Sequence, residues 1–525
     1  MTATTIRTVP VHLDVPEQHR ARVLWVLDTL LAPCDARVAL ERDPARAADC
    51  ALVYAHHPMP GLPTVPASSR ATELFAHDAP LPPAEFAPFD TPVGPLPGAF
   101  AMPSEGFVVP FDPLASAFVL LACWDEHIST ARDMYDRLPY AAGVFAENPA
   151  LDIGAPPVDG YLRLLRSLMN ERLVELGAPP LDEPGWGDGA AAGHFAVALT
   201  HDIDNLWRWT PRGVATEVRR AARAVRYRRW PMLRRELRDL RLWLTHHLPR
   251  RTDPYWTFPA LLAGEDDRGV SSTFFVIAGH AHPLDGAQPR TYARRIAPAL
   301  ALLRAAKREI GLHGNDRDRS SLSALAADRA DLESRSGAAV DGARYHYLRC
   351  RYHETLPLLD RAGFAYDSSI AFAEHEGLRC GFSYPFHPYD LGRERPLDIV
   401  ELPLALMDAT LAEPHYRNLD ADAARAASLA VLQRLRASGG GAALLWHNVR
   451  FDAAGADGYD QLYWELIDWI GAHGGVALPA AELVRRWRER CGEPAAAGAA
   501  GSPSAPTAIA DAAPADTSPA PKAGS

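Results

Sequence analysis

Short apolar runs alternate with helix-like segments over the second part of the chain. Eight of these runs have the length and composition of buried strands: residues 195–199, 272–277, 309–312, 343–348, 364–367, 399–406, 442–446 and 475–478. Helical material lies between most of them, and this rhythm is typical of parallel strands joined by crossover helices. About seven or eight such units can close on themselves. We therefore predict an α/β fold for residues 191–492, an irregular parallel (β/α) barrel of seven or eight strands.

The residues before this region predict a separate unit. Apolar runs at 9–14 and 50–54 indicate strands, and helical periodicity appears at 17–31, 113–125 and 160–176. Residues 185–193 are rich in glycine and alanine and read as a linker. We therefore expect an N-terminal α+β accessory domain over residues 1–190. Residues 493–525 are rich in alanine, proline and serine without apolar periodicity, which is typical of a disordered tail.

Composition sets limits on the function. The chain has 525 residues, of which 48% are hydrophobic, so it is long enough for two or more domains. Its net charge of −11 gives no general case for nucleic-acid binding, and its cysteines form no C-x-x-C pair that would indicate a zinc knuckle. We find no secretory signal and no apolar stretch that could span a bilayer, so we expect a cytoplasmic protein. The oligomeric state is not predicted.

One insertion within the predicted barrel, residues 212–251, is crowded with arginine. Tyr227, Trp230 and Trp243 are interleaved with the arginines. A solvated helical hairpin whose arginines pair with nearby acids explains this composition. An anionic membrane surface, a lipid-linked sugar or an acidic glycan as partner is the alternative. Because basic runs are usually solvated faces, the sequence favours the hairpin and leaves peripheral membrane association open.

Two aspartates, Asp202 and Asp204, follow the apolar run at 195–199. Residues i and i+2 of an extended chain point to the same side. Two carboxylates that face one spot repel each other unless a cation or a proton lies between them. Strand ends of α/β folds commonly carry such sites. The alternative is that Asp204 caps a helix at 205–209.

Other polar side chains close further apolar runs in the same way: His313, Arg344, His346 and His447. Arg344 and His346 alternate with Tyr345 and so share one face of a predicted strand. A core histidine bonded to a backbone carbonyl would explain any one of these residues, but it explains the whole series poorly. We therefore expect these side chains and the two aspartates to converge at one mouth of the barrel.

With these residues, the segment 194–490 resembles the polysaccharide deacetylase superfamily, the metal-dependent deacetylases of carbohydrate esterase family four. Thr200-His201-Asp202-Ile203-Asp204 is similar to the first motif in its spaced D-x-D form. His313 matches the start of the second motif, whose second histidine is replaced here by Arg317. Arg344 fits the third motif, and Leu444-Leu445-Trp446-His447 fits the last. Asp253-Pro254-Tyr255-Trp256-Thr257-Phe258 and Ser272-Thr273-Phe274-Phe275 resemble segments of an uncharacterised branch of this superfamily, in which an N-terminal domain precedes the barrel.

The resemblance implies a deacetylase-type barrel that removes an acyl group, N-acetyl foremost, from a sugar of a glycan or glycoconjugate. It implies a divalent metal, with zinc the first choice for carboxylate and imidazole ligands. Asp204 and His313 would be metal ligands. The catalytic residues would be Asp202 as base, Arg344 as the residue that orients it, and His447 as general acid.

The third protein ligand stays open. His346 is the best candidate because it shares a face with Arg344, and Asp316 and Asp318 come next. A histidine ring that only packs beside Tyr345 and Tyr347 is the alternative for His346. Because Arg317 replaces a metal histidine, a catalytically degenerate barrel that binds a glycan is an alternative function. A hydrolase of another C–N amide bond is a further one, since one fold hosts many reactions.

Overall fold

The computed structural model describes residues 6–71, 85–103, 105–186, 194–208, 211–228, 253–278, 289–451 and 457–493, with single positions between 230 and 244. Most of the predicted linker at 185–193, and the predicted tail except Glu493, lie outside the described residues. In the described part of the chain, no helix is both long and apolar enough to cross a membrane.

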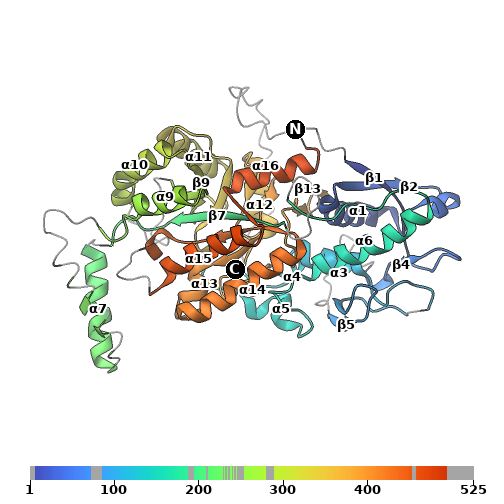
Figure 1. The fold of residues 1–525 in the computed structure, drawn as a ribbon, viewed down its shortest axis with the longest axis horizontal. Helices are drawn as coiled ribbons and strands as arrows, with labels where there is room; N and C mark the ends of the chain where they lie inside the picture. Colours follow the sequence, from blue (N-terminus) through green and yellow to red (C-terminus); the bar gives the residue numbers. More distant parts are fainter. Residues whose placement is uncertain are drawn as a thin grey trace, which may run out of the picture.

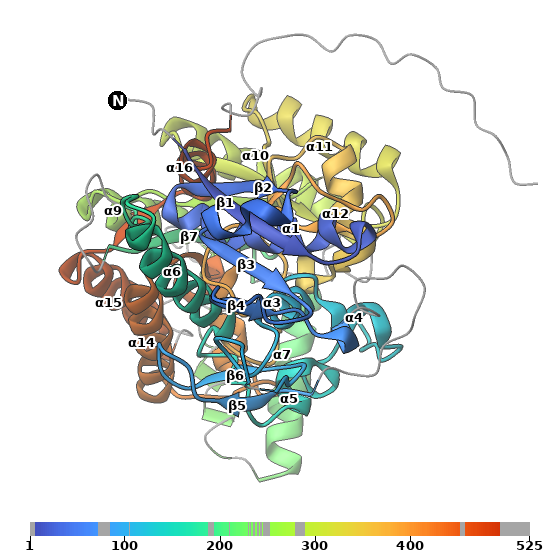
Figure 2. The ribbon, with the colours of Figure 1, turned by 90° about the vertical axis from the view of Figure 1, so that its right-hand side faces the viewer.

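The N-terminal unit contains a parallel sheet with strand order β2-β1-β3-β4. Helices α1, α3 and α6 pack against one another beside it, as Figure 2 shows. The elements of the unit are β1 (Arg7–Asp14), α1 (Glu17–Leu31), β2 (Ala36–Glu41), β3 (Leu52–Ala55), β4 (Thr64–Pro66), β5 (Ala87–Phe89), β6 (Leu96–Gly98), α3 (Pro113–Leu121), α4 (Trp124–Ile128), α5 (Val144–Glu147) and α6 (Pro157–Glu175).

A second, larger sheet of parallel strands follows in the order β14-β11-β10-β9-β8-β7-β16-β15, with β17 also paired to β7. Every predicted run forms strand in this sheet. The strands are β7 (Ala196–Ile203), β8 (Thr273–Ile277), β9 (Glu309–Gly314), β10 (Gly342–Tyr345), β11 (Tyr366–Asp367), β14 (Val400–Glu401), β15 (Leu404–Met407), β16 (Gly441–Leu445) and β17 (Val476–Leu478).

The two outermost strands of this sheet, β14 and β15, are halves of one predicted run. The chain changes partner between them. The Leu402 N–H donates to the Asp367 carbonyl (2.8 Å), whereas the Pro403 carbonyl accepts from Ala443 N–H (2.7 Å). Proline has no N–H to give to a ladder, so it is suited to the break. The two ends of the strand path are therefore joined through Leu402 and Pro403, and the curled parallel sheet confirms the predicted (β/α) barrel fold.

Helices cover the outside of the barrel (Figure 1). They are α9 (Phe258–Asp267), α10 (Pro289–Ala305), α11 (Leu322–Ser336), α12 (Tyr352–Arg361), α13 (Asp408–Ala412), α14 (Ala421–Ser438), α15 (Tyr459–Ala472) and α16 (Ala480–Arg490). Helix α7 (Pro211–Arg226) instead projects away from the body of the molecule (Figure 1). A small hairpin of β12 (Tyr389–Asp390) and β13 (Arg395–Pro396) lies against α1.

Alternation along β7 decides which side chains face the barrel interior. His201 points outward: its Nδ1 lies 2.6 Å from the Trp446 carbonyl and its Nε2 lies 3.1 Å from Glu265 Oε1. Because side chains alternate along a strand, Thr200 and Asp202 point to the opposite side, into the barrel. The ladder between β7 and β8 continues to Ile203, so the strand ends four residues beyond the predicted apolar run.

Candidate metal centre

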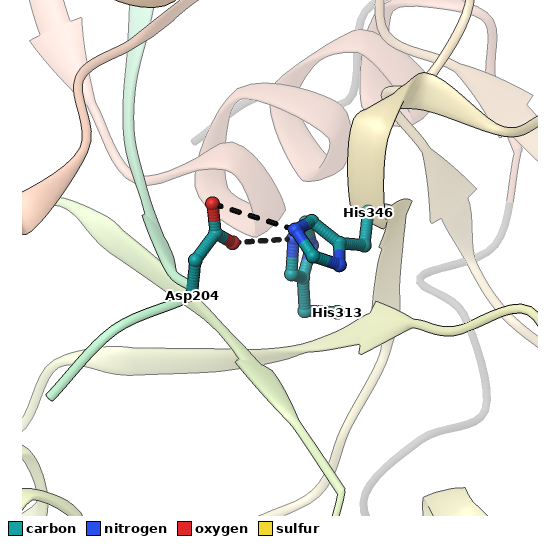
Figure 3. A group of neighbouring side chains, drawn as sticks. All are labelled: Asp204, His313 and His346. Atoms are coloured by element: carbon teal, nitrogen blue, oxygen red, sulfur yellow. Dashed lines mark ion pairs between the residues drawn. The ribbon is translucent and has the colours of Figure 1, made fainter. Parts of the chain in front are cut away.

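Three strand ends bring one carboxylate and two imidazoles together. Asp204 directly follows β7, His313 lies near the end of β9, and His346 directly follows β10. Their nearest ligand atoms all lie within 4.8 Å of one another (Figure 3). Asp204 Oδ1 is 3.0 Å from His313 Nε2, and Asp204 Oδ2 is 3.6 Å from His346 Nε2. The alternative that Asp204 caps a helix is wrong, since residues 205–208 are not helical.

The orientation of His313 fits a metal ligand. Its Nδ1 lies 2.9 Å from the Arg344 carbonyl and can donate its proton there, which leaves the Nε2 lone pair facing Asp204. With the proton on Nδ1, His313 Nε2 and Asp204 Oδ1 are both acceptors, and in the described part of the chain neither buried atom receives a hydrogen bond. Buried polar atoms normally have partners. The donor set therefore fits a cation held between the carboxylate and the imidazoles.

The charge state of Asp204 is also suited to a cation. Burial raises the pKa of its carboxyl group, but the nearby His346, His313 and His447 outweigh burial and hold this pKa well below its usual range. Asp204 is therefore an ionised carboxylate, which is the form that binds metals.

Arg344 fixes the position of Asp202. The Arg344 side chain is fully buried, and its Nη1 donates to Thr200 Oγ1 (2.6 Å) and Asp202 Oδ1 (3.3 Å). Its Nε and Nη2 donate to the carbonyl and hydroxyl of Ser368, both at 2.8 Å. The guanidinium also lies over the Phe275 ring, 4.6 Å from its centroid. A group held on so many sides has little freedom, so Asp202 is presented to the centre in one orientation.

His447 approaches the same carboxylate from the end of β16. Its Nε2 is 3.5 Å from Asp204 Oδ2, and its Nδ1 is 2.6 Å from Asp408 Oδ1. Arg450 Nε donates to the other Asp408 oxygen (2.8 Å). Burial lowers the pKa of His447, but Asp408 and Asp204 raise it to about 10. Burial raises the pKa of Asp408, but His447 and Arg450 lower it to about 2. The imidazole is therefore held protonated.

The sequence analysis did not identify Asp408. The same signal that identified the other residues could have found it, because Asp408 directly follows the apolar strand β15. Its role as a partner of His447 depends on the distance between β15 and β16, which no local pattern specifies.

The other candidate ligands lie in contacts of their own. Asp316 Oδ1 is 3.1 Å from Arg319 Nε and 3.4 Å from Arg349 Nη1. Asp318 Oδ1 accepts from the backbone N–H of Asn315 (3.0 Å). Neither aspartate belongs to the three-residue group.

Arg317, which replaces the expected histidine, points to Asp328 at 2.7 Å. Residue 317 is therefore not part of the group, and His346 is its second histidine. The strand β10 ends at Tyr345, so His346 begins a turn of 3₁₀ helix rather than continuing the predicted strand.

A segment of the N-terminal unit supports His346. Tyr347 and Leu348 have φ values of 58° and 55°, a left-handed conformation that costs non-glycine residues about 1–2 kcal/mol each. Arg137 Nη1 donates to the Tyr347 carbonyl (2.6 Å). The Tyr135 ring stacks on Tyr347 (4.5 Å between centroids), which in turn stacks on His346 (3.9 Å). The N-terminal unit therefore holds this turn in place.

The depressed pKa of Asp408 predicts an acid-sensitive contribution to stability. The folded value of about 2 lies below the ordinary 3.8, so the contribution is fully present above about pH 4 and is lost as the pH falls towards 2. It amounts to about 2 kcal/mol of unfolding free energy. We expect the stability gap between the wild type and Asp408→Asn, measured by urea unfolding, to narrow from about pH 6 to about pH 3. A gap that stays constant would contradict the proposed ionisation of Asp408.

Comparison with protein families matches residues 14–174 to a family of unknown function, DUF7033. This match lies within the predicted N-terminal accessory domain. A comparison with the curated proteins finds no match.

The solved structures that match this chain do so at low sequence identity. A protein from Mycobacterium smegmatis described as a polysaccharide deacetylase is 19% identical, covers 58% of this chain and 94% of its own, and has a TM-score of 0.38. Puue allantoinase is 14% identical, covers 59% and 97%, and has a TM-score of 0.38. A CE4 family pseudoenzyme from Bacillus anthracis is 10% identical, covers 56% and 67%, and has a TM-score of 0.29.

Proposed function

We propose that the barrel is a metal-dependent hydrolase that removes an acyl group, N-acetyl foremost, from a sugar of a glycan or glycoconjugate. The observation that carries the proposal is the group of Asp204, His313 and His346, with Asp202 and His447 beside it. Both flanking residues approach the group closely: His313 Nδ1 lies 3.8 Å from Asp202 Oδ2, and His447 Nε2 lies 3.5 Å from Asp204 Oδ2.

Asp204, His313 and His346 would hold the metal. One carboxylate and two imidazoles suit zinc and leave a coordination position for substrate or water. A divalent ion there would polarise the acyl carbonyl and favour formation of the nucleophile.

The other residues supply proton transfers. Asp202, aimed by Arg344, would take a proton from the attacking water. The water oxygen forms a bond to the acyl carbon and the C–N bond breaks. His447, which Asp408 keeps protonated, would donate its proton to the leaving amine nitrogen. Base and acid thus each have a buried partner that fixes the orientation of the side chain, Arg344 for Asp202 and Asp408 for His447.

The experiment is acetate release from N-acetylated chito-oligosaccharides by metal-stripped protein and by the same protein reloaded with zinc. We expect release only after reloading.

Two alternative functions predict other results. A degenerate glycan-binding barrel, which Arg317 at the expected histidine position favours, would bind the sugar without releasing acetate. A hydrolase of another C–N bond would be inactive on every acylated sugar tested and active on simple amides or imides.

The stacked rings of Tyr135, Tyr347 and His346 predict an effect of Tyr135 on metal affinity. Tyr135→Ala removes no ligand, but it frees the Tyr347 ring that packs on His346. We expect zinc affinity, measured by competition with a chelator, to fall by about tenfold, the lower end of what the loss of a ligand-orienting partner costs. Tyr140→Ala is the matched control, because Tyr140 of the same unit stacks on His375 instead. Equal affinity loss in both variants would exclude a specific role for Tyr135.

A further inference from the structure

Exposed apolar side chains are concentrated in one part of the molecule. The described part of the chain has ten large hydrophobic side chains that are exposed, and six of them lie in the insertion: Val218, Val225, Tyr227, Trp230, Leu237 and Leu244. Single exposed hydrophobic residues are ordinary, but a concentration of this kind marks an interaction surface.

These side chains form stripes along helices. In α7, Val218 and Val225 are seven residues apart, so they lie on one face, and Arg219, Arg223 and Arg226 are exposed along the flank beside it. After a turn at residues 227–228, Trp230, Leu237 and Leu244 are again spaced seven residues apart, at positions that are also helical. Each helical segment therefore carries an apolar face that the described part of the barrel does not bury.

The charge of this segment is opposite to that of the whole chain. Residues 211–244 contain eleven arginines and three acidic residues, in a protein of net charge −11. The segment therefore attracts an anionic partner, while the rest of the molecule does not.

We propose that α7 and the helical positions after it bind the surface of a lipid bilayer that contains anionic lipids. Apolar stripes would enter the boundary between headgroups and acyl chains, and the arginines would contact the headgroup charges. An acidic glycan would pair with the arginines but would leave Val218, Val225 and the later stripe in water. A membrane therefore accounts for both the apolar side chains and the arginines of the segment.

The position of the segment gives this binding a consequence. Helix α7 begins at Pro211, shortly after Asp204 at the mouth of the barrel, and projects beyond the covering helices (Figure 1). Docking of α7 would hold that mouth near the bilayer surface. The proposal concerns binding alone and does not depend on the proposed hydrolase activity.

The test is co-sedimentation of the full chain with vesicles of phosphatidylcholine alone or mixed with phosphatidylglycerol. We expect binding only to the mixed vesicles, with a steep loss between about 50 mM and about 500 mM salt. The double variants Val218→Asp/Val225→Asp and Arg219→Gln/Arg223→Gln should each lower the bound fraction about tenfold or more, since both the apolar and the charged contacts contribute. Val174→Asp on α6 and Arg361→Gln on α12, which alter exposed residues elsewhere, should bind like the wild type.

Three results would overturn the proposal. Absence of binding to the mixed vesicles is the first. The second is binding that the arginine variant removes and the valine variant leaves intact, because it would reveal charge attraction alone. The third is a concentration-dependent dimer in analytical ultracentrifugation that the valine variant dissociates, since the stripe would then be covered by a second copy. Circular dichroism spectra like those of the wild type will show that the variants fold.

Discussion

Asp204→Ala is expected to abolish metal binding and hydrolysis together. Asp204 contributes the carboxylate that lies 3.0 Å from His313 Nε2 and 3.6 Å from His346 Nε2. Its removal leaves two imidazoles without the negative charge that keeps a cation between them. We expect zinc affinity to fall by more than the roughly 10–100-fold that loss of a ligand-orienting partner costs. Acetate release should fall to background at any zinc concentration that leaves the wild type saturated.

Asp316→Ala is the matched control for this variant. Asp316 is an acidic residue close in sequence to His313, but it contacts Arg319 and Arg349 rather than the three-residue group. Metal stoichiometry and hydrolysis should therefore stay at wild-type levels. If Asp316→Ala loses metal and Asp204→Ala retains it, the ligand set proposed here is wrong.

Asp202→Asn is expected to keep the metal and lose turnover. The substitution preserves the size of the side chain, and the amide oxygen can still accept the hydrogen bond from Arg344. An amide cannot take the proton from water, so hydrolysis should fall about a hundredfold or more. The measurement is metal stoichiometry and acetate release on the same protein preparation.

His447→Ala should behave in the same way, because His447 donates a proton and is not one of the three ligands. Variants of the base and of the acid would then differ from Asp204→Ala by retaining metal. An inverted pattern, in which Asp202→Asn strips the metal and Asp204→Ala does not, would exchange the roles assigned to the two aspartates. Unchanged hydrolysis in all three variants would mean that this constellation is not the active site.

The barrel was predictable because its strands are short, buried on both sides and separated by helical segments. Each apolar run of the sequence forms strand, including the run at 399–406 that the structure splits at Leu402 and Pro403. The end of β7 was less predictable. An apolar run marks only the hydrophobic part of a strand. All eight residues of β7 are buried, and pairing with β8 maintains the ladder from Thr200 to Ile203 although the inward side chains of Thr200 and Asp202 are polar.

The candidate site could be read from the sequence only where a polar residue closes an apolar run. This signal identified Asp204, His313 and His447, and the structure brings them together. It could not choose among the candidates for the third position, because the choice depends on where the turn after β10 directs His346. It also could not reveal Tyr135. This residue lies in the N-terminal unit, 212 residues before Tyr347, and its ring stacks on Tyr347.

The central claim is that Asp204, His313 and His346 together hold one divalent ion. The most direct test is anomalous X-ray scattering at the zinc absorption edge from crystals of the full chain grown with zinc. The account predicts one strong peak, about 2.0–2.2 Å from an oxygen of Asp204, from His313 Nε2 and from His346 Nε2. A zinc peak bound instead by Asp316 or Asp318, or the lack of any peak among these three side chains at saturating zinc, would contradict it.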